Sequence, residues 1–167
     1  MRCIIEPDIL IRPGEERDIE TLTRFNIAMA RETENKILRY DVVSSGVRQM
    51  LGHPEWGFYV VAETNGAVIG LLMVTFEWSD WHDGFYWWIQ SVYVDPNYRR
   101  KGIYRSLYEH VKAMAIERND VCRFRLYVVQ ENTAARTTYA SLGVREMNFM
   151  MYEEVINLNT VHIRILM

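Results

Sequence analysis

A short basic loop that ends in a glycine is the segment of this sequence best suited to bind an anion. Residues 99–102 (Arg-Arg-Lys-Gly) follow a β-branched and aromatic run that ends at Asp95-Pro96, and a helical pattern begins directly after them. The first N–H groups of a helix have no partner within the helix, and the helix dipole makes that end positive. These groups and the three basic side chains favour a pyrophosphate. The same residues would also fit an exposed basic turn without a ligand, in which Gly102 is needed only for the backbone conformation.

Size and composition predict one domain over residues 1–167. Apolar residues make up 49% of the chain, which is enough for a core, and the net charge of −3 argues against broad nucleic-acid binding. The cysteines and histidines have no metal-binding spacing, so we expect no metal site and no disulfide framework. The N-terminus lacks the apolar run of a signal peptide, and no segment is long and apolar enough to span a membrane. We therefore expect a cytoplasmic protein without nucleic-acid or membrane partners.

Hydrophobic periodicity predicts a mixture of helices and strands. Asn65-Gly66 is a strong hairpin signal between two strands, and Asn132 is a good N-cap for the last helix. The expected helices cover residues 15–35, 40–51, 102–118 and 132–142. The expected strands cover residues 8–12, 58–63, 67–78, 85–94, 123–129 and 149–155, and residues 161–166 are a further candidate. This order predicts an α+β fold in which helices pack on the faces of a sheet that includes three consecutive antiparallel strands.

A tyrosine on the last predicted helix is a second candidate for chemistry. Tyr139 lies seven residues after Asn132, which is about two helical turns, so the two residues face the same side of the helix. Judged from the residues alone, Tyr139 is a core tyrosine whose hydroxyl is satisfied by the backbone.

The basic loop and the Tyr139 segment together resemble the GNAT superfamily of acyl-CoA-dependent N-acetyltransferases. The family's signature is Gln or Arg, two residues, Gly, one residue, then Gly or Ala, directly after a strand. Here it is Arg-Arg-Lys-Gly-Ile-Tyr at 99–104, in which Tyr104 replaces the small residue. Residues 126–143, with Asn132, Tyr139 and a closing Leu-Gly, resemble the family's second motif.

This resemblance covers residues 9–155, nearly the whole chain, and implies the GNAT fold. In that fold the sheet is mostly antiparallel and twisted, and helices lie on both of its faces. The strands at 85–94 and 123–129 would splay apart.

The resemblance also implies that acetyl-CoA is the cofactor. Backbone N–H groups of residues 100–104 would hold the pyrophosphate, and Arg99 would add charge. Main-chain groups of the preceding strand would bind the pantetheine arm where a β-bulge opens the sheet, although that strand is equally compatible with ordinary core packing. The implied cofactor-binding residues are Val92, Tyr93, Val94, Arg99, Arg100, Lys101, Gly102, Ile103, Tyr104, Asn132 and Ala135.

For the reaction, the resemblance implies direct attack of a neutral amine on the thioester in a ternary complex. Tyr139 would protonate the departing thiolate, since a phenol has a pKa of roughly 10 and a thiol roughly 8.5. A backbone N–H near Tyr93 would stabilise the oxyanion. Some relatives place a Glu that acts as the base where this sequence has Gln90, so the proton would pass to another carboxylate or to a chain of water molecules. Glu77 is the first candidate; Asp80, Glu32 and Glu34 are the others, and each of these acids is equally an ordinary surface charge.

The expected acceptor is a small cationic amine. Four of the five tryptophans lie in residues 76–88, together with Glu77, Asp80 and Asp83, and this mixture suits an ammonium ion. The same aromatic side chains would fit a hairpin that packs on the core or on a partner subunit. The residues expected to bind the acceptor are Glu32, Glu34, Trp78 and Asp80.

Two other functions fit the sequence. The acceptor could be an amine of a protein or peptide. The chain could also be a non-catalytic acyl-CoA-binding module of the same fold, which the departures at Gln90 and Tyr104 leave open. A homodimer is compatible with all of these, and the apolar residues 161–167 would offer a pairing strand.

Overall fold

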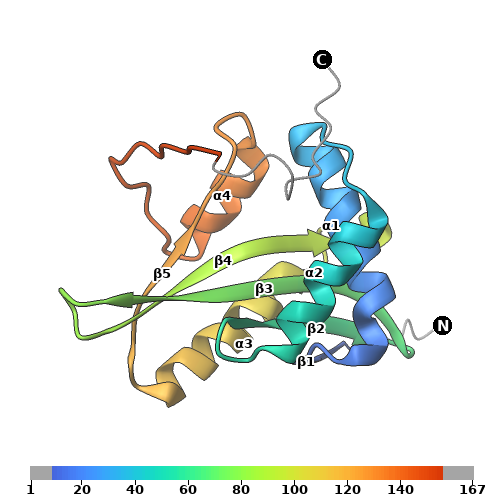
Figure 1. The fold of residues 1–167 in the computed structure, drawn as a ribbon, viewed down its shortest axis with the longest axis horizontal. Coiled ribbons are helices and arrows are strands. Elements are labelled where there is room, and N and C mark those ends of the chain that lie inside the picture. Colours follow the sequence, from blue (N-terminus) through green and yellow to red (C-terminus); the bar gives the residue numbers. More distant parts are fainter. Residues whose placement is uncertain (1–8, 156–167) are drawn as a thin grey trace, which may run out of the picture.

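The computed structural model describes residues 9–155 of the chain. In this range an α+β fold forms around one sheet, as predicted (Figure 1). The strands are β1 (Leu10–Pro13), β2 (Gly57–Thr64), β3 (Ala67–Ser79), β4 (Gly84–Val94) and β5 (Val121–Leu126). The helices are α1 (Ile19–Glu34), α2 (Tyr40–Gly52), α3 (Ile103–Arg118) and α4 (Thr133–Ser141), with short 3-10 turns η1 (Glu16–Asp18) and η2 (Pro96–Tyr98).

The five strands form one sheet in the order β1-β2-β3-β4-β5. Strands β1 to β4 pair antiparallel, and β5 pairs with β4 in parallel. Parallel neighbours need a long crossover, which α3 supplies between β4 and β5. The predicted, mostly antiparallel sheet is therefore confirmed.

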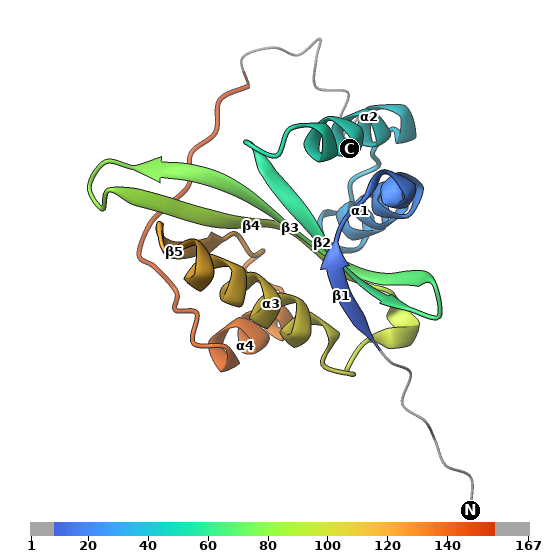
Figure 2. The ribbon, with the colours of Figure 1, turned by 90° about the horizontal axis from the view of Figure 1, so that it is seen from below.

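Helices cover both faces of this sheet. Figure 2 shows α1 and α2 on one side and α3 and α4 on the other. The α1 side buries a cluster that includes Leu22 and Leu71, and the α3 side buries a larger cluster that includes Trp87 and Val111. Because side chains alternate along a strand, the same central strands supply both clusters.

Two local sequence signals are confirmed. Asn65 and Gly66 have backbone φ angles of 51° and 75°, as the two central residues of a tight hairpin between β2 and β3 require. Asn132 caps α4, because its Oδ1 accepts a hydrogen bond from the N–H of Ala135 at 3.1 Å. Both segments adopt the predicted conformation because the residues that direct it are neighbours in the chain.

The strand predicted at 149–155 is wrong. These residues form no strand, and their apolar side chains are exposed, Phe149 by 81% and Tyr152 by 85%. Apolar content does not make a strand unless a neighbouring strand pairs with its backbone. The strand predicted at 123–129 is observed as β5, and it ends at Leu126 where its pairing with β4 ends. The candidate strand at 161–166 lies outside the described residues.

A buried ion-pair network fixes the start of α1 against β1 and β2. Arg12 donates to the two oxygens of Asp18 at 2.7 and 2.9 Å and to Glu63 at 2.7 Å. The Asp18 side chain is only 4% exposed. Burial by itself would raise the pKa of Asp18, but hydrogen bonds from Arg12 and from the Glu15 N–H outweigh it and hold the pKa below its usual value.

We predict that Asp18→Asn destabilises the fold by about 3 kcal/mol at neutral pH, because Arg12 loses a buried partner. The lowered pKa means that the Asp18 carboxylate stabilises the fold above the unfolded-state pKa of about 3.9, and that this contribution disappears as the pH falls through the folded-state pKa. Urea unfolding at pH 7 and at pH 3 measures both effects. The exposed pair of Arg39 and Asp41 supplies the control: Asp41→Asn should leave the unfolding midpoint unchanged. Equal midpoints for wild type and Asp18→Asn at pH 7 would contradict the prediction.

Candidate functional site

β4 and β5 pair along only part of β4. Their last paired residues are Ile89 and Leu126. Beyond this point β4 continues to Val94 with β3 as its neighbour, while β5 turns away from it (Figure 1). The predicted splay between the two strands is therefore confirmed.

A β-bulge in β4 lies at the point where the splay begins. Met73 of β3 pairs with Ser91, but the next residue, Val74, pairs with Ile89, so Gln90 is an extra residue in β4. A bulge increases the local twist and redirects the strand. The bulge therefore contributes to the divergence of β4 from β5.

Two residues of β4 direct backbone groups into the opening. The N–H of Asp95 donates to a carbonyl of β3 at 2.9 Å. Because alternate residues of an antiparallel strand face the same neighbour, Tyr93 also directs its backbone groups to β3, and Val92 and Val94 direct theirs to the other side. A hydrogen bond from Arg99 supports this assignment, because its Nε donates to the Val94 carbonyl at 2.9 Å, on the side away from β3. Of the three residues predicted to bind a pantetheine arm, Val92 and Val94 thus have backbone groups on the open side.

The 99–104 loop leads from η2 into α3. Arg100 and Gly102 have left-handed backbones, with φ angles of 63° and 77°. The N–H of Ser106 donates to the Gly102 carbonyl at 3.0 Å, so the N–H groups of residues 103–105 precede the first helical hydrogen bond. A Cβ placed on Gly102 would meet no atom within 4 Å. The loop therefore combines helix N–H groups with open space, as an anion site requires.

The basic side chains of the loop are partly engaged by the protein. Arg99 Nη2 lies 2.7 Å from an oxygen of Glu32, and the other oxygen of Glu32 accepts a hydrogen bond from the Tyr93 hydroxyl at 2.9 Å. The ammonium group of Lys101 lies 5.0 Å from the ring centre of Tyr98. Glu32 therefore connects the end of α1 to β4 and the loop, and it partly neutralises Arg99.

The structure brings the two sequence motifs together. The rings of Tyr104 and Tyr139 are in edge contact, with 5.7 Å between their centres. Burial raises the pKa of both tyrosines, and the nearby phenol of Tyr139 raises that of Tyr104 further. Tyr139 therefore carries its proton throughout the neutral range. The Tyr104 hydroxyl is buried and has no hydrogen-bond partner among residues 9–155.

The acids predicted near the acceptor are not brought together. Glu32 and Glu34 lie at the end of α1, where Glu34 is exposed and pairs with Lys36 at 2.5 Å. Asp80 is exposed in the turn between β3 and β4, and Glu77 lies on β3. These acids therefore do not form a single acidic wall.

Glu77 and Trp78 lie on opposite faces of the sheet. Glu77 pairs with Tyr86, whereas Trp78 pairs with Phe85 and packs against its ring with 5.1 Å between ring centres. Neighbours in a strand point in opposite directions, so the sequence cluster of acidic and aromatic residues is divided between the two faces.

Sequence reasoning missed two arginines of β5. In the parallel register Arg123 lies beside Tyr86 and Arg125 beside Trp88. Glu77 completes this group, since its carboxylate accepts hydrogen bonds from Trp88 Nε1 and, at 3.4 Å, from Arg125 Nη1. We call these five residues the open face. The alternation of Arg with apolar residues in Val-Cys-Arg-Phe-Arg-Leu, at 121–126, was the available signal.

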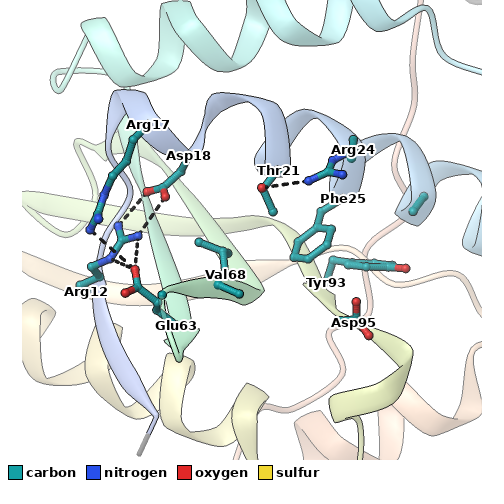
Figure 3. A pocket seen from close by; sticks show the side chains of 13 residues that line it. Arg12, Arg17, Asp18, Thr21, Arg24, Phe25, Glu63, Val68, Tyr93 and Asp95 are labelled. Carbon is teal, nitrogen blue, oxygen red and sulfur yellow. Dashed lines mark hydrogen bonds and ion pairs between the residues drawn. The ribbon is translucent and has the colours of Figure 1, made fainter.

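A separate cavity of about 470 Å³ lies between α1 and the hairpin that joins β2 and β3 (Figure 3). Its charged side chains at one end are paired with one another, and Phe25 and Tyr93 lie at the other end. The paired residues are Arg12, Arg17, Asp18 and Glu63. Of the predicted site residues in the described range, Tyr93 alone lines this cavity, so it is distinct from the 99–104 loop.

Other features of the described residues bear on the chemistry. Between residues 9 and 155 no three His, Cys, Asp or Glu side chains form a group that could hold a metal ion. No helix in the same range has the length and apolar character to cross a membrane. Cys122 lies in the paired part of β5, where its Sγ is 3.3 Å from the Phe85 carbonyl, and not in the opening.

Residues 21–144 match the model of the acetyltransferase (GNAT) family, which is more than half of the chain. The protein belongs to the GNAT acetyltransferase family. A solved structure from Clostridium difficile 630, a possible acetyltransferase, is 42% identical to it. That comparison covers 91% of this chain and all of the other, with a TM-score of 0.84. No curated protein sequence matches the chain.

More distant GNAT-like structures share the fold. The aminoglycoside N-acetyltransferase AAC(6')-Iy, solved with CoA, is 14% identical, covers 93% of this chain and 100% of its own, and has a TM-score of 0.77. A ribosomal-protein-alanine N-acetyltransferase from Brucella melitensis biovar Abortus 2308 is 15% identical, covers 89% and 99% of the two chains, and has a TM-score of 0.70. The family match and the Clostridium difficile likeness make this GNAT protein an acyltransferase.

The buried hydroxyl of Tyr104 gives a test of the site's geometry without a ligand. We predict that Tyr104→Phe stabilises the ligand-free protein by about 1 kcal/mol, because it removes a buried polar group that has no protein partner. Tyr59→Phe is the matched control and should destabilise, since the Tyr59 hydroxyl accepts a hydrogen bond from Asn26 at 3.4 Å. Denaturant unfolding of both variants measures the difference. Destabilisation by Tyr104→Phe would mean that its hydroxyl is not an unsatisfied group.

Proposed function

We propose that this chain transfers an acetyl group from acetyl-CoA to the primary amine of a small molecule that arrives as an ammonium ion. The reaction is a direct attack of the deprotonated amine on the thioester within a ternary complex. The family membership supports the reaction class, and the arrangement of β4 and the 99–104 loop supports the use of acetyl-CoA.

One observation carries the proposal: next to a helix N-terminus, β4 has backbone groups that pair with no neighbouring strand, of which the Val94 carbonyl accepts a hydrogen bond from Arg99. Val92 and Val94 direct N–H and C=O groups into the opening beside β5, and the 99–104 loop follows them in the chain. An extended amide-containing arm that ends in a diphosphate matches this order of groups, because amides pair with strand backbone and phosphates with helix N–H groups. The open space beside Gly102 fits the same ligand.

In this proposal the loop binds the diphosphate through backbone N–H groups more than through side chains. Arg99 is partnered by Glu32, so its role is to hold α1, β4 and the loop in register. Arg100 and Lys101 add positive charge at the surface. Asn132 caps α4, and Ala135 lies in the first turn of this helix, which carries Tyr139.

Tyr139 is the proposed acid. Burial raises its pKa, so the hydroxyl keeps its proton until it can give it to a thiolate. A backbone N–H on the open side of β4, from Val92 or Val94, is the proposed donor to the oxyanion, since the Tyr93 backbone faces β3. Acetyl-CoA, when bound, supplies the activated acyl group.

Glu77 is the proposed base. Its carboxylate accepts a hydrogen bond from Trp88, which lies on the same face of the sheet. Trp88 precedes the bulge at Gln90 by two residues. Both Glu77 and Glu32 accept two hydrogen bonds. Glu32 is less suited as the base, because its bonds to Tyr93 and Arg99 connect α1 to β4 and the 99–104 loop. Glu34 and Asp80 are exposed at the edges of the molecule.

The activity assay described below also distinguishes two other functions. A protein or peptide amine as acceptor and a non-catalytic CoA-binding module would use the same opening and loop. The cytoplasmic location and the homodimer stay predictions.

The reaction is tested by incubating the protein with acetyl-CoA and a panel of small amines and measuring free thiol. We predict that Tyr139→Phe lowers kcat by roughly 100-fold, because the thiolate then leaves without a proton donor, and leaves the KM for acetyl-CoA unchanged. The wild-type rate should not decline through loss of the Tyr139 proton below pH 10, since the pKa is raised above its usual value. Unchanged single-turnover rates in Tyr139→Phe would exclude Tyr139 as the acid. CoA binding without thiol release from any amine, peptides included, would favour the non-catalytic module.

The diphosphate site is tested by a charge at Gly102. We predict that Gly102→Glu weakens CoA binding by roughly 100-fold, about 3 kcal/mol, because the new carboxylate would face the phosphates. Gly102→Asn is the matched control. It also places a side chain on the left-handed backbone at position 102, which Asn adopts more readily than most residues, but it adds no charge. Calorimetric titration with CoA measures both. Equal affinities for the two variants would place the phosphates elsewhere.

A further inference from the structure

We propose that the open face binds a carboxylate of the acceptor, so that the substrate is an amino acid or a related amine with an acidic group. This inference rests on the proposed function and names the substrate class of the same site. It distinguishes amino-acid-like amines from polyamines, which carry only positive charge.

The open face has more positive than negative charge. It contains Arg123 and Arg125 but one carboxylate, that of Glu77, and Glu77 also accepts a hydrogen bond from Trp88. The turn residues Asp80 and Asp83 form no ion pair with either arginine, and Arg123 has no acidic partner within 4 Å among residues 9–155. Arg125 therefore has one acidic partner and Arg123 has none among residues 9–155, so the face can accept another anion.

Besides the ion pair of Arg125 with Glu77, both guanidinium groups contact aromatic and imidazole side chains. Arg125 lies 4.0 Å from the ring centre of Tyr86 and 5.4 Å from that of Trp88. Arg123 lies 3.0 Å from Nε2 of His82, and because arginine only donates, that nitrogen accepts. His82 Nδ1 is in turn 2.8 Å from the Tyr86 hydroxyl. Stacking and hydrogen bonding orient the two arginines while most of their N–H donors remain available.

The contacts of Glu77 show that the N–H donors of the open face can bind a carboxylate. The Glu77 carboxylate accepts hydrogen bonds from two N–H donors, Arg125 Nη1 and Trp88 Nε1. Arginine has five N–H donors in a rigid plane and binds carboxylates in pairs of hydrogen bonds. Donors of Arg125 and Arg123 not used by Glu77 or His82 could hold a second carboxylate in the same way.

The open face and the opening lie at successive positions along β4. Trp88 pairs with Arg125 one residue before the last β4–β5 pair, and Val92, a proposed donor to the oxyanion, lies four residues beyond Trp88, roughly 13 Å along the strand. An acceptor that binds both positions must carry its amine well away from its carboxylate. The side-chain amine of a basic amino acid fits this separation better than an α-amine does.

The face is accessible from the side on which an acceptor would approach. Tyr86, Trp88 and their β5 neighbours project from the sheet face that α1 and α2 cover farther along. Figures 1 and 2 both show the hairpin of β3 and β4 extending clear of α1 and α2. Arg123 is exposed, and the Arg125 side chain is 39% exposed. The two arginines are therefore open to solvent.

Matched amines test the proposal, because lysine and cadaverine, or ornithine and putrescine, differ only by a carboxylate. We expect kcat/KM to be at least roughly 10-fold higher for each amino acid than for its diamine, as the loss of a charged hydrogen bond predicts. In the double variant Arg123→Gln, Arg125→Gln this ratio should fall toward one, and Arg123→Lys should retain part of it. Arg24→Gln, an exposed arginine on α1, is the control and should leave the ratio unchanged. Preference for the diamines, or a ratio unaffected by the double variant, would overturn the proposal.

A binding measurement separates this inference from the proposed reaction. Nε-acetyl-lysine and N-acetylcadaverine are the corresponding products, and calorimetry measures their affinity without turnover. Tighter binding of Nε-acetyl-lysine, lost in the double variant, supports the carboxylate site even if no amine releases thiol, an outcome that would contradict only the proposed reaction. Equal affinities of the two products, with CoA bound normally, would overturn the carboxylate site alone.

Discussion

The site depends on one constraint of the sheet, which is that β4 and β5 cannot remain paired beyond Ile89 and Leu126. Backbone N–H and C=O groups need partners wherever they are shielded from water, and a strand that loses its neighbour exposes them along one edge. The bulge at Gln90 marks the start of the divergence, and the antiparallel register with β3 decides that Val92 and Val94 face the opening. The chain then turns through the 99–104 loop into α3, so the strand groups without a strand partner and the helix N-terminus follow one another. A ligand that combines amides with phosphates can satisfy both.

The alternation of side chains in the same strands gives the two faces of the sheet different roles. On the α3 side Trp87 and its neighbours form the core, and α4 brings Tyr139 against Tyr104 close to the start of α3. On the α1 side Tyr93 reaches Glu32, and farther along the strands the open face presents two arginines. The proposed acid and the proposed acceptor site therefore lie on opposite sides of the sheet and can meet only through the opening between β4 and β5. This arrangement explains why one short break in strand pairing can organise the whole site.

Much of the fold followed from local patterns in the sequence. The hairpin at Asn65-Gly66, the cap at Asn132 and the helix after Gly102 were predicted, because turn and cap residues act on their immediate neighbours. The strand at 149–155 was predicted wrongly, because a β-rich composition does not reveal whether a partner edge is available. The acidic and aromatic cluster near Trp78 was also misleading, because strand geometry divides residues that are adjacent in sequence between two faces. The arginines of β5 were missed because their importance depends on the register with β4.

The sequence by itself determined the order and type of most elements, the loop that resembles an anion site, and the family to which its motifs point. Periodicity, turn residues and caps are properties of neighbouring residues, so a single chain is enough to read them. Only the tertiary structure decided which distant groups meet. Glu32 lies 67 residues from Arg99 and Glu77 lies 48 residues from Arg125, yet each pair forms an ion pair. Such contacts follow from strand register and from the packing of helices on a twisted sheet, which depend on the burial of the whole core and not on any local segment.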